Sequence, residues 1–264
     1  MEVAIEFSRV SLAFDDKVVL RDVSFQLERA HTKIVIGASG SGKSTILRLV
    51  LGLLKPDGGE IRINGERVDQ MREEELMRVR AGLGMVFQEG ALFDSLTVRE
   101  NVGYRLFEET AMPIPDVDAR VNEVLGFVGL TEFVGRMPSE LSGGQRRRVA
   151  IARALTAKPK VLLYDEPTTG LDPITALTVD DEIVKLRDIE GVSAMLVTHQ
   201  LRDAFYIATH EAVREGSELR FVPASPDKLK MTEFIMLKDG LVAFDGGADE
   251  LRHSADPYLK AFLS

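Results

Sequence analysis

The residues best suited to chemistry lie at positions 37–45, where the sequence reads Gly-Ala-Ser-Gly-Ser-Gly-Lys-Ser-Thr. This stretch fits the phosphate-loop pattern G-x-x-x-x-G-K-[ST]. Glycines let the backbone curl until its N–H groups point at phosphate oxygens, and the following helix adds its own unpaired N–H groups. The lysine supplies a charge for the outer phosphates and the serine offers a hydroxyl to Mg²⁺. The predicted phosphate-binding residues are Gly37, Ala38, Ser39, Gly40, Ser41, Gly42, Lys43, Ser44 and Thr45.

A strand and a helix flank this loop, as the motif requires. Residues 33–36 form a short, β-branched apolar run that predicts a buried strand, and residues 46–51 predict a helix. The alternative is a glycine-rich turn that caps an ordinary helix. The agreement of the motif with both flanks favours phosphate binding.

Two adjacent carboxylates follow another apolar run, at residues 161–164. Ligands in open α/β sheets bind at the ends of strands, which is where these carboxylates are expected. Asp165 is placed to hold Mg²⁺, directly or through a water molecule. Glu166 is placed to orient or deprotonate the attacking water. Such pairs are more often solvated than catalytic, but the phosphate loop favours the catalytic interpretation.

Residues 141–145 read Leu-Ser-Gly-Gly-Gln and open a helix through Arg153. A serine hydroxyl and glycine N–H groups at a helix N-terminus form a second anion-binding device. Together with the phosphate loop, this segment resembles the ATP-binding cassette (ABC) family, whose signature is LSGGQ. The resemblance covers nearly the whole chain.

The resemblance implies an ATPase that uses ATP and Mg²⁺, with further marks in the expected order. Gln88 corresponds to the Q-loop glutamine, Gly170-Leu171-Asp172 to the D-loop and His199 to the switch histidine. Phe14 stands where the family places an aromatic residue that stacks on adenine. The implied catalytic residues are Glu166, His199 and Gln88, and the implied Mg²⁺ ligands are Ser44, Gln88 and Asp165.

The family also implies that two such domains pair head to tail, so that each ATP lies between one copy's phosphate loop and the other copy's signature. The chain therefore needs a second copy of itself or a paralogue. Binding of ATP would join the copies and hydrolysis would separate them, as a two-state switch. The residues implied to act on the neighbour's nucleotide are Ser142, Gly143, Gly144, Gln145 and Asp172.

Strands that alternate with helices predict an α/β fold with a largely parallel sheet covered on both faces. Residues 3–30 predict short strands, and residues 88–158 are dominated by helical signals. The resemblance implies one ABC nucleotide-binding domain over 1–264: a RecA-like P-loop core, an N-terminal antiparallel β subdomain and an inserted helical lobe. Residues 1–87 and 159–264 would form the core with the β subdomain, and residues 88–158 the lobe.

Local signals predict several details that the structure can test. Hairpins are expected at Asp15-Asp16, Asn64-Gly65 and Asp239-Gly240. Thr97 and Glu100 form a capping-box pattern that opens a helix toward residue 109, and residues 112–115 read as a linker. Residues 209–232 are longer than the usual link in the family and include a short strand at 219–222. Two interpretations of this insertion stay open, a mobile surface insertion and a contact with the dimer or a regulator.

Composition limits the partners of the chain. The formal net charge of -9 argues against a general nucleic-acid binder, and no nucleic-acid partner is predicted. The basic run 146–148 is interpreted as a solvated helix face with some packed stems. Cysteine is absent, no apolar run approaches the roughly 20 residues that cross a bilayer, and the N-terminus lacks a signal-peptide pattern. Any action at a membrane is expected to require a partner.

Segments 87–98, 136–141 and 172–175 resemble those of the Mla/Mce-type ATPases. These work with an integral membrane permease and a lipid-binding Mce-type protein to move phospholipids or other hydrophobic molecules across the envelope of diderm bacteria. The resemblance implies a peripheral protein at the cytoplasmic face of the inner membrane. Two alternatives remain: an importer ATPase for a polar solute, and a non-transport ABC ATPase in cofactor assembly.

Overall fold

Six strands form one sheet through the middle of the computed structural model, which describes residues 2–88, 90–216 and 218–263. Met1, Glu89, Ser217 and Ser264 lie outside the described residues, so the predicted segments 87–98 and 209–232 each contain one position that is not described. Five strands run parallel and the strand at one edge is antiparallel to its neighbour, which confirms the predicted fold class. In spatial order they are β12 (Leu241–Gly247), β11 (Thr232–Lys238), β3 (Thr32–Gly37), β8 (Ser193–Val197), β7 (Val161–Asp165) and β6 (Leu83–Val86).

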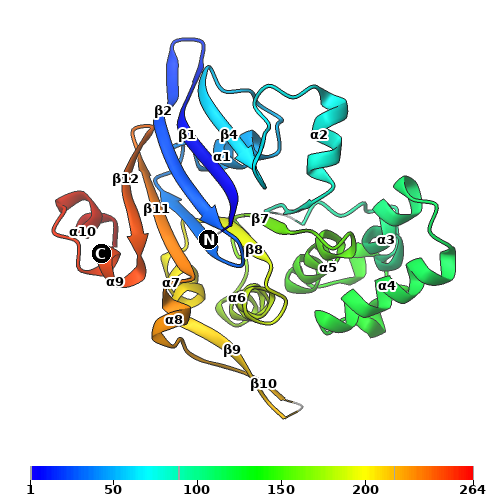
Figure 1. The fold of residues 1–264 in the computed structure, drawn as a ribbon. Coiled ribbons are helices and arrows are strands. Elements are labelled where there is room, and N and C mark those ends of the chain that lie inside the picture. The colour runs from blue at the N-terminus through cyan, green and yellow to red at the C-terminus, as the bar shows by residue number, and fades with distance from the viewer. Residues whose placement is uncertain (1, 89, 217, 264) are drawn as a thin grey trace.

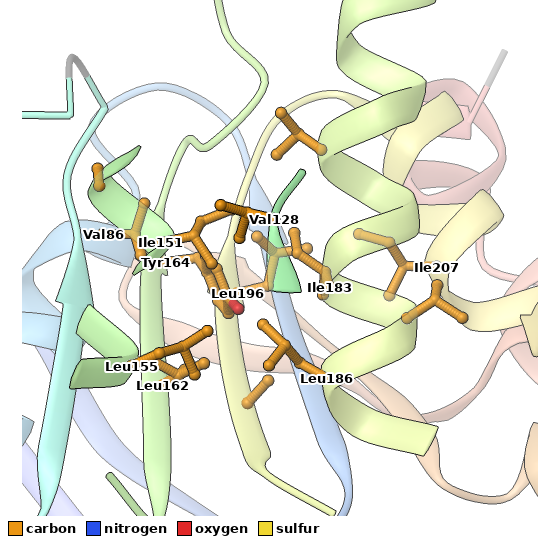
Figure 2. Close-up of a cluster of buried hydrophobic side chains, with 14 of the residues drawn as sticks. Val86, Val128, Ile151, Leu155, Leu162, Tyr164, Ile183, Leu186, Leu196 and Ile207 are labelled. Carbon is orange, nitrogen blue, oxygen red and sulfur yellow. The ribbon is translucent and has the colours of Figure 1, made fainter. Parts of the chain in front are cut away.

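Both faces of the central strands are buried, because helices or a second sheet cover each side. Along β7, Val161 and Leu163 join one apolar cluster, and Leu162 and Tyr164 join the other. Figure 2 shows the second cluster, in which Leu162 and Tyr164 lie among apolar side chains from the covering helices. The first face is covered by α1 (Lys43–Val50), and the second by α5 (Gly143–Thr156), α6 (Pro173–Asp188) and α7 (Leu201–Thr209).

A separate antiparallel sheet holds the N-terminal strands above this core (Figure 1). Its first hairpin turns at Asp15-Asp16, with Phe14 paired to Lys17, as the sequence predicts. The strands are longer than the predicted short runs, because irregular register lets the first one bend and continue past Arg9, whose φ is 51°. In spatial order the strands are β2 (Lys17–Glu28), β1 (Val3–Phe14), β4 (Gly58–Ile63) and β5 (Glu66–Arg67), with the predicted turn at Asn64-Gly65.

Helices dominate residues 88–158, and their caps follow the sequence. The N–H of Glu100 donates to Thr97 Oγ1 at 3.3 Å and the N–H of Thr97 donates to Glu100 at 2.7 Å, so the predicted capping box is confirmed. The predicted linker is too long, because α4 begins at Ile114 with Pro115 in its first turn, where proline needs no N–H. The helices of this region that precede α5 are α3 (Val98–Glu109), α4 (Ile114–Phe127), and the short 3₁₀ turns η1 (Thr131–Phe133) and η2 (Pro138–Glu140). Helix α2 (Glu73–Arg80) lies before this region. The domain boundaries at 87/88 and 158/159 stay a prediction.

The segment predicted as an insertion builds a hairpin that projects from the core (Figure 1). Its predicted strand at 219–222 lies inside a longer one. The strand that pairs with it was missed, although the sequence reads Gly-Ser at 216–217, a dipeptide typical of hairpins. The root of the hairpin is held by hydrogen bonds, and both interpretations, a mobile surface insertion and a contact with the dimer or a regulator, stay predictions. The elements are β9 (His210–Glu215), β10 (Glu218–Pro223) and α8 (Pro226–Leu229), and after β12 the chain ends in α9 (Ala248–Arg252) and α10 (Pro257–Leu263).

A buried ion pair forms this root. The Arg187 side chain donates to the carbonyls of Ile207 at 2.8 Å and His210 at 2.7 Å, and pairs with Asp188 at 2.8 Å. Asp188 in turn accepts from the N–H of Ala212 at 3.0 Å and from Lys228 at 2.9 Å. Both buried charges are thereby satisfied, as burial requires.

A second buried carboxylate, Asp180 on α6, carries a testable consequence. Its side chain is 1% exposed, and burial, with a contribution from Asp203, raises its pKa to about 9. A native pKa above the unfolded value means that the folded state holds the proton, so the free energy of unfolding falls as pH rises from about 4 to about 9. Each pH unit in that window costs up to about 1.4 kcal/mol.

We therefore expect Asp180→Asn to stabilise the chain more at pH 8 than at pH 5, because asparagine has no proton to lose. The melting temperature should be measured across pH 4 to 9 and compared with Asp227→Asn, which changes an exposed carboxylate. If the difference in melting temperature between Asp180→Asn and wild type stays the same at every pH in this range, the prediction is wrong.

Candidate functional site

The loop between β3 and α1 wraps an anion-sized space with its backbone. Gly42, the N-cap of α1, has φ 101°, and a Cβ there would lie 2.9 Å from Leu20. A Cβ at Gly37 would lie 2.6 Å from the carbonyl oxygen of Leu237, so neither glycine can be replaced without strain. Among the described residues, Ser41 Oγ is one of the few buried side-chain atoms without a hydrogen-bond partner. An oxyanion in the loop would supply that partner.

Lys43 lies inside the loop that it is predicted to serve. Its Nζ donates to the carbonyl oxygens of Gly37 at 2.9 Å and Ala38 at 3.1 Å. Burial lowers the pKa of Lys43, while the nearby carboxylates Glu166 and Asp165 raise it. The ammonium group is therefore held by weak neutral acceptors, and a phosphate oxygen would be a stronger partner.

Asp165 ends β7 directly beside the start of α1. Its Oδ1 accepts from Ser44 Oγ at 3.1 Å. Burial raises the pKa of Asp165, the Ser44 hydroxyl lowers it, and neighbouring Glu166 raises it again. Two hard oxygen donors at the edge of a phosphate loop match the ligand preference of Mg²⁺, so these residues fit that ion.

Glu166 and His199 come together because β7 and β8 are neighbours in the sheet. His199 Nδ1 and Glu166 Oε1 lie 2.8 Å apart. The other oxygen of Glu166 accepts from the hydroxyls of Thr169 at 3.0 Å and Thr198 at 3.3 Å, and from the N–H of His199 at 3.3 Å. Glu166 also has φ 50°, an uncommon value for a non-glycine residue. The carboxylate is thus fixed in position by backbone and side-chain contacts.

These groups share one cavity of about 350 Å³. The sequence predicts most of its walls, whereas Leu201 and Phe262 were missed because nothing local marks them as site residues. Gln88 follows β6 and Phe14 ends β1, and both are exposed outside this cavity. Thr45 lies in the first turn of α1. The residues lining the cavity are Gly37, Ala38, Ser39, Lys43, Glu166, His199, Leu201 and Phe262.

The predicted signature residues lie outside the cavity and pack against the D-loop of the same chain. Ser142 caps α5, accepting from the N–H of Gln145 at 3.2 Å. Asp172 caps α6, accepting from the N–H groups of Ile174 and Thr175, each at 3.1 Å. The two caps adjoin, because a Cβ on Gly144 would lie 2.1 Å from Thr175 Cγ2. The signature and the D-loop therefore lie side by side, and none of their residues lines the cavity.

The basic run after the signature corrects an expectation. Arg147 is 6% exposed and donates to the carbonyl oxygens of Phe87 at 3.0 Å and Thr169 at 3.2 Å. Arg146 and Arg148 also donate to carbonyl oxygens and are partly buried. A solvated helix face is the wrong interpretation, because the planar guanidinium groups satisfy backbone carbonyls in the interior. Arg147 thereby links the signature helix to the strand end before Gln88 and to the loop after Glu166.

Comparison with known proteins identifies the family to which the chain belongs. The family model described as ABC transporter matches residues 20–169. The chain is a member of the ABC transporter family. As an ATPase subunit of an ABC transporter, it hydrolyses ATP in a reaction coupled to transport.

The relatives cover nearly all of the chain. It is 38% identical over 280 residues to the chloroplastic protein TRIGALACTOSYLDIACYLGLYCEROL 3 of Arabidopsis thaliana, covering 100% of this chain and 74% of that protein. It is 34% identical over 259 residues to the intermembrane phospholipid transport system ATP-binding protein MlaF of Escherichia coli, covering 98% and 88%. Identity to the methionine import ATP-binding protein MetN of Cereibacter sphaeroides is 41% over 228 residues, covering 84% and 64%.

Solved structures agree with the fold. The dimeric post-hydrolysis structure of the ATP-binding cassette MJ0796, bound to ADP and Pi, superposes with a TM-score of 0.74 at 29% identity, covering 92% of this chain and 98% of that one. The likeness extends over nearly the whole of both chains and supports the cassette fold.

The contact between Gly144 and Thr175 yields a prediction. We expect Gly144→Ala to destabilise the chain by about 1–3 kcal/mol, because the new methyl group overlaps Thr175 Cγ2. Adding Thr175→Ser should restore most of that stability, since serine lacks the methyl group but keeps the hydroxyl that donates to Asp172 at 2.5 Å. Urea unfolding of the single and double variants measures both effects, and equal stability of the two variants would contradict this account.

Proposed function

We propose that two copies of this chain pair head to tail, hydrolyse ATP at the seam and drive phospholipid movement through a membrane permease. The carrying observation is the division of the site: Lys43, Glu166 and His199 line one cavity, and the signature residues lie outside it. A second copy is the natural source of the missing half. The signature would present Ser142, Gly143, Gly144 and Gln145, and the D-loop Asp172, to the neighbour's nucleotide.

The residues of the cavity take defined roles in this reaction. Lys43 exchanges the carbonyls of Gly37 and Ala38 for phosphate oxygens, and residues 37–45 donate backbone N–H groups. Ser44, Asp165 and Gln88 would hold Mg²⁺, which when bound offsets phosphate charge. Phe14, exposed at the end of β1, would stack on adenine.

Glu166 is the proposed general base. Contacts from Thr169, Thr198 and the N–H of His199 hold one of its oxygens, so the carboxylate can accept a proton from an attacking water without reorienting. His199 Nδ1 contacts the glutamate, and in the imidazolium form the ring would also donate from Nε2 to a γ-phosphate oxygen. The histidine thereby couples the presence of the phosphate to the orientation of the base.

Similarity to lipid-transport ATPases supports the proposal that the transported substrate is a phospholipid. The relatives named for phospholipid transport and for trigalactosyldiacylglycerol extend over 98–100% of this chain, whereas the methionine importer covers 84%. A polar-solute importer is therefore the second candidate, and a cofactor-assembly ATPase the third. Within the described ranges, no helix has the length and apolar character needed to span a bilayer. We place the chain at the cytoplasmic face of the inner membrane, with a permease and an Mce-type lipid-binding protein.

An exposed apolar surface suits the permease. It lies around the end of α1, α2, the end of β6 and the start of α3, where Arg105 joins α3 to the carbonyl of Ala81 at 3.3 Å. The rings of Phe93 and Tyr104 are 4.7 Å apart there. Exposed apolar groups of this kind mark an interaction site. The exposed apolar side chains on these elements are Leu53, Met77, Phe87, Phe93 and Tyr104, and we propose that together they form the permease surface.

Glu166→Gln tests the catalytic assignment. Turnover should fall by about 10²–10⁴-fold because the amide cannot accept the proton, while ATP binding persists. Purified with Mg-ATP, the variant should elute as a dimer with nucleotide bound, and Glu132→Gln, at an exposed site, should behave as wild type. Full ATPase activity in Glu166→Gln would remove the base assignment.

Met77→Asp tests the permease surface. We expect it to abolish co-purification with a multi-helix membrane protein in mild detergent and to leave ATPase activity of the isolated chain unchanged. Leu241→Asp, at another exposed apolar position, on β12, is the control. Mass spectrometry of the intact wild-type complex should find bound phospholipid, and a bound polar solute instead would favour the importer.

A further inference from the structure

The last helix of the described chain reaches the catalytic cavity. Phe262 on α10 lines the same space as Ser39, Glu166 and His199. Figure 1 shows α9 and α10 beside β12, at the opposite end of the molecule from α3 and α4.

We propose that α10 is a latch held in cis: it occupies the face of the cavity that the second copy must reach, and it has to leave before the ATP sandwich closes. This inference rests on the proposed head-to-tail pair. Ser39 and His199 flank the position of the outer phosphates, which a neighbour's signature would have to approach. An aromatic ring against those residues and a neighbour's helix cannot fill the same space.

The base of the latch is firmly attached. Leu251 on α9 is fully buried, and Arg252 lies over the ring of Phe205 on α7 at 4.5 Å. Helix α7 follows His199 directly. The C-terminal segment is thus tied to the element that carries the switch histidine, and its base can stay in place while its tip moves.

The tip, α10, has one buried side chain, while Tyr258, Phe262 and Leu263 pack on the core and stay partly exposed. Among the residues of α10, all of which are described, Leu259 is the buried one. Tyr258 contacts Lys238 at 4.1 Å, and Asp256 caps the helix by accepting from the N–H of Tyr258 at 2.7 Å. A helix that carries its own cap and little buried surface belongs to the low-stability end of local opening.

Removal of the latch tests it in a Glu166→Gln background. A chain that ends at Asp256, and separately Phe262→Ala, should form the Mg-ATP dimer at lower ATP concentration than the full chain, by about tenfold if the packed form holds nine chains in ten. Lys260→Ala, exposed on the same helix, should change nothing. Size-exclusion chromatography at graded ATP concentrations reads out the dimer.

The outcomes separate the two ideas. Dimers that form at equal ATP concentration with and without α10 overturn the latch and leave the proposed function standing. A truncated chain that dimerises less readily also overturns it, because α10 would then belong to the interface. Absence of any dimer, with or without α10, overturns both proposals.

A second measurement reports displacement itself. The native chain has no cysteine, so Leu259→Cys in the Glu166→Gln background introduces a single thiol at a position that is 2% exposed. Iodoacetamide should label it slowly without nucleotide and several-fold faster with Mg-ATP. Leu251→Cys on α9 is the control whose protection should persist. Equal labelling rates of Leu259→Cys in both states would contradict a helix that leaves.

Discussion

The position of β8 between β3 and β7 is the constraint on which the rest of this molecule depends. Parallel strands end at one edge of a sheet, so the phosphate loop after β3, the carboxylates after β7 and the histidine after β8 must meet there. Residues more than 30 positions apart in the chain reach hydrogen-bond distance without any local signal that would pair them. The apolar, buried strands fix the register of that edge, and their packing therefore fixes the relative positions of the phosphate loop, the carboxylates and the histidine.

Buried charged side chains fix the positions of elements that lie outside the central sheet. Arg147 on the signature helix donates hydrogen bonds to the carbonyls of Phe87 and Thr169. These two residues lie close in sequence to Gln88 and Glu166, so the signature helix is connected to both segments. The pair of Arg187 and Asp188 fixes the root of the β9–β10 hairpin in the same way. Both guanidinium groups are buried and donate to backbone carbonyls, so removing these acceptors would leave a buried charge uncompensated. These arginines act as rigid connectors between backbone segments.

Local chemistry explains what the sequence could predict. The phosphate loop, the capping box at Thr97 and the hairpin at Asn64-Gly65 depend on residue types at short spacing, and the structure confirms the cap and the hairpin. The contact of Glu166 with His199 and the burial of Arg147 depend on register between distant segments, which spacing does not encode. Phe262 is the extreme case, since its place in the cavity follows from how α9 packs on α7. The strand β9 pairs with the next strand in the chain, so a local signal could have found it.

With the proposed latch, ATP binding must release α10 in both copies before they can pair. A dimer needs both copies open, so the cost of release enters twice: if about one chain in ten is open, the dimerisation constant falls about 100-fold. Nucleotide that favours the open form in each copy would then act steeply on pairing, and a partner that captures α10 would do the same without nucleotide. Because α9 packs on α7, capture would also act on the helix that positions His199. Pairing and catalytic alignment would therefore respond together to one weakly held helix.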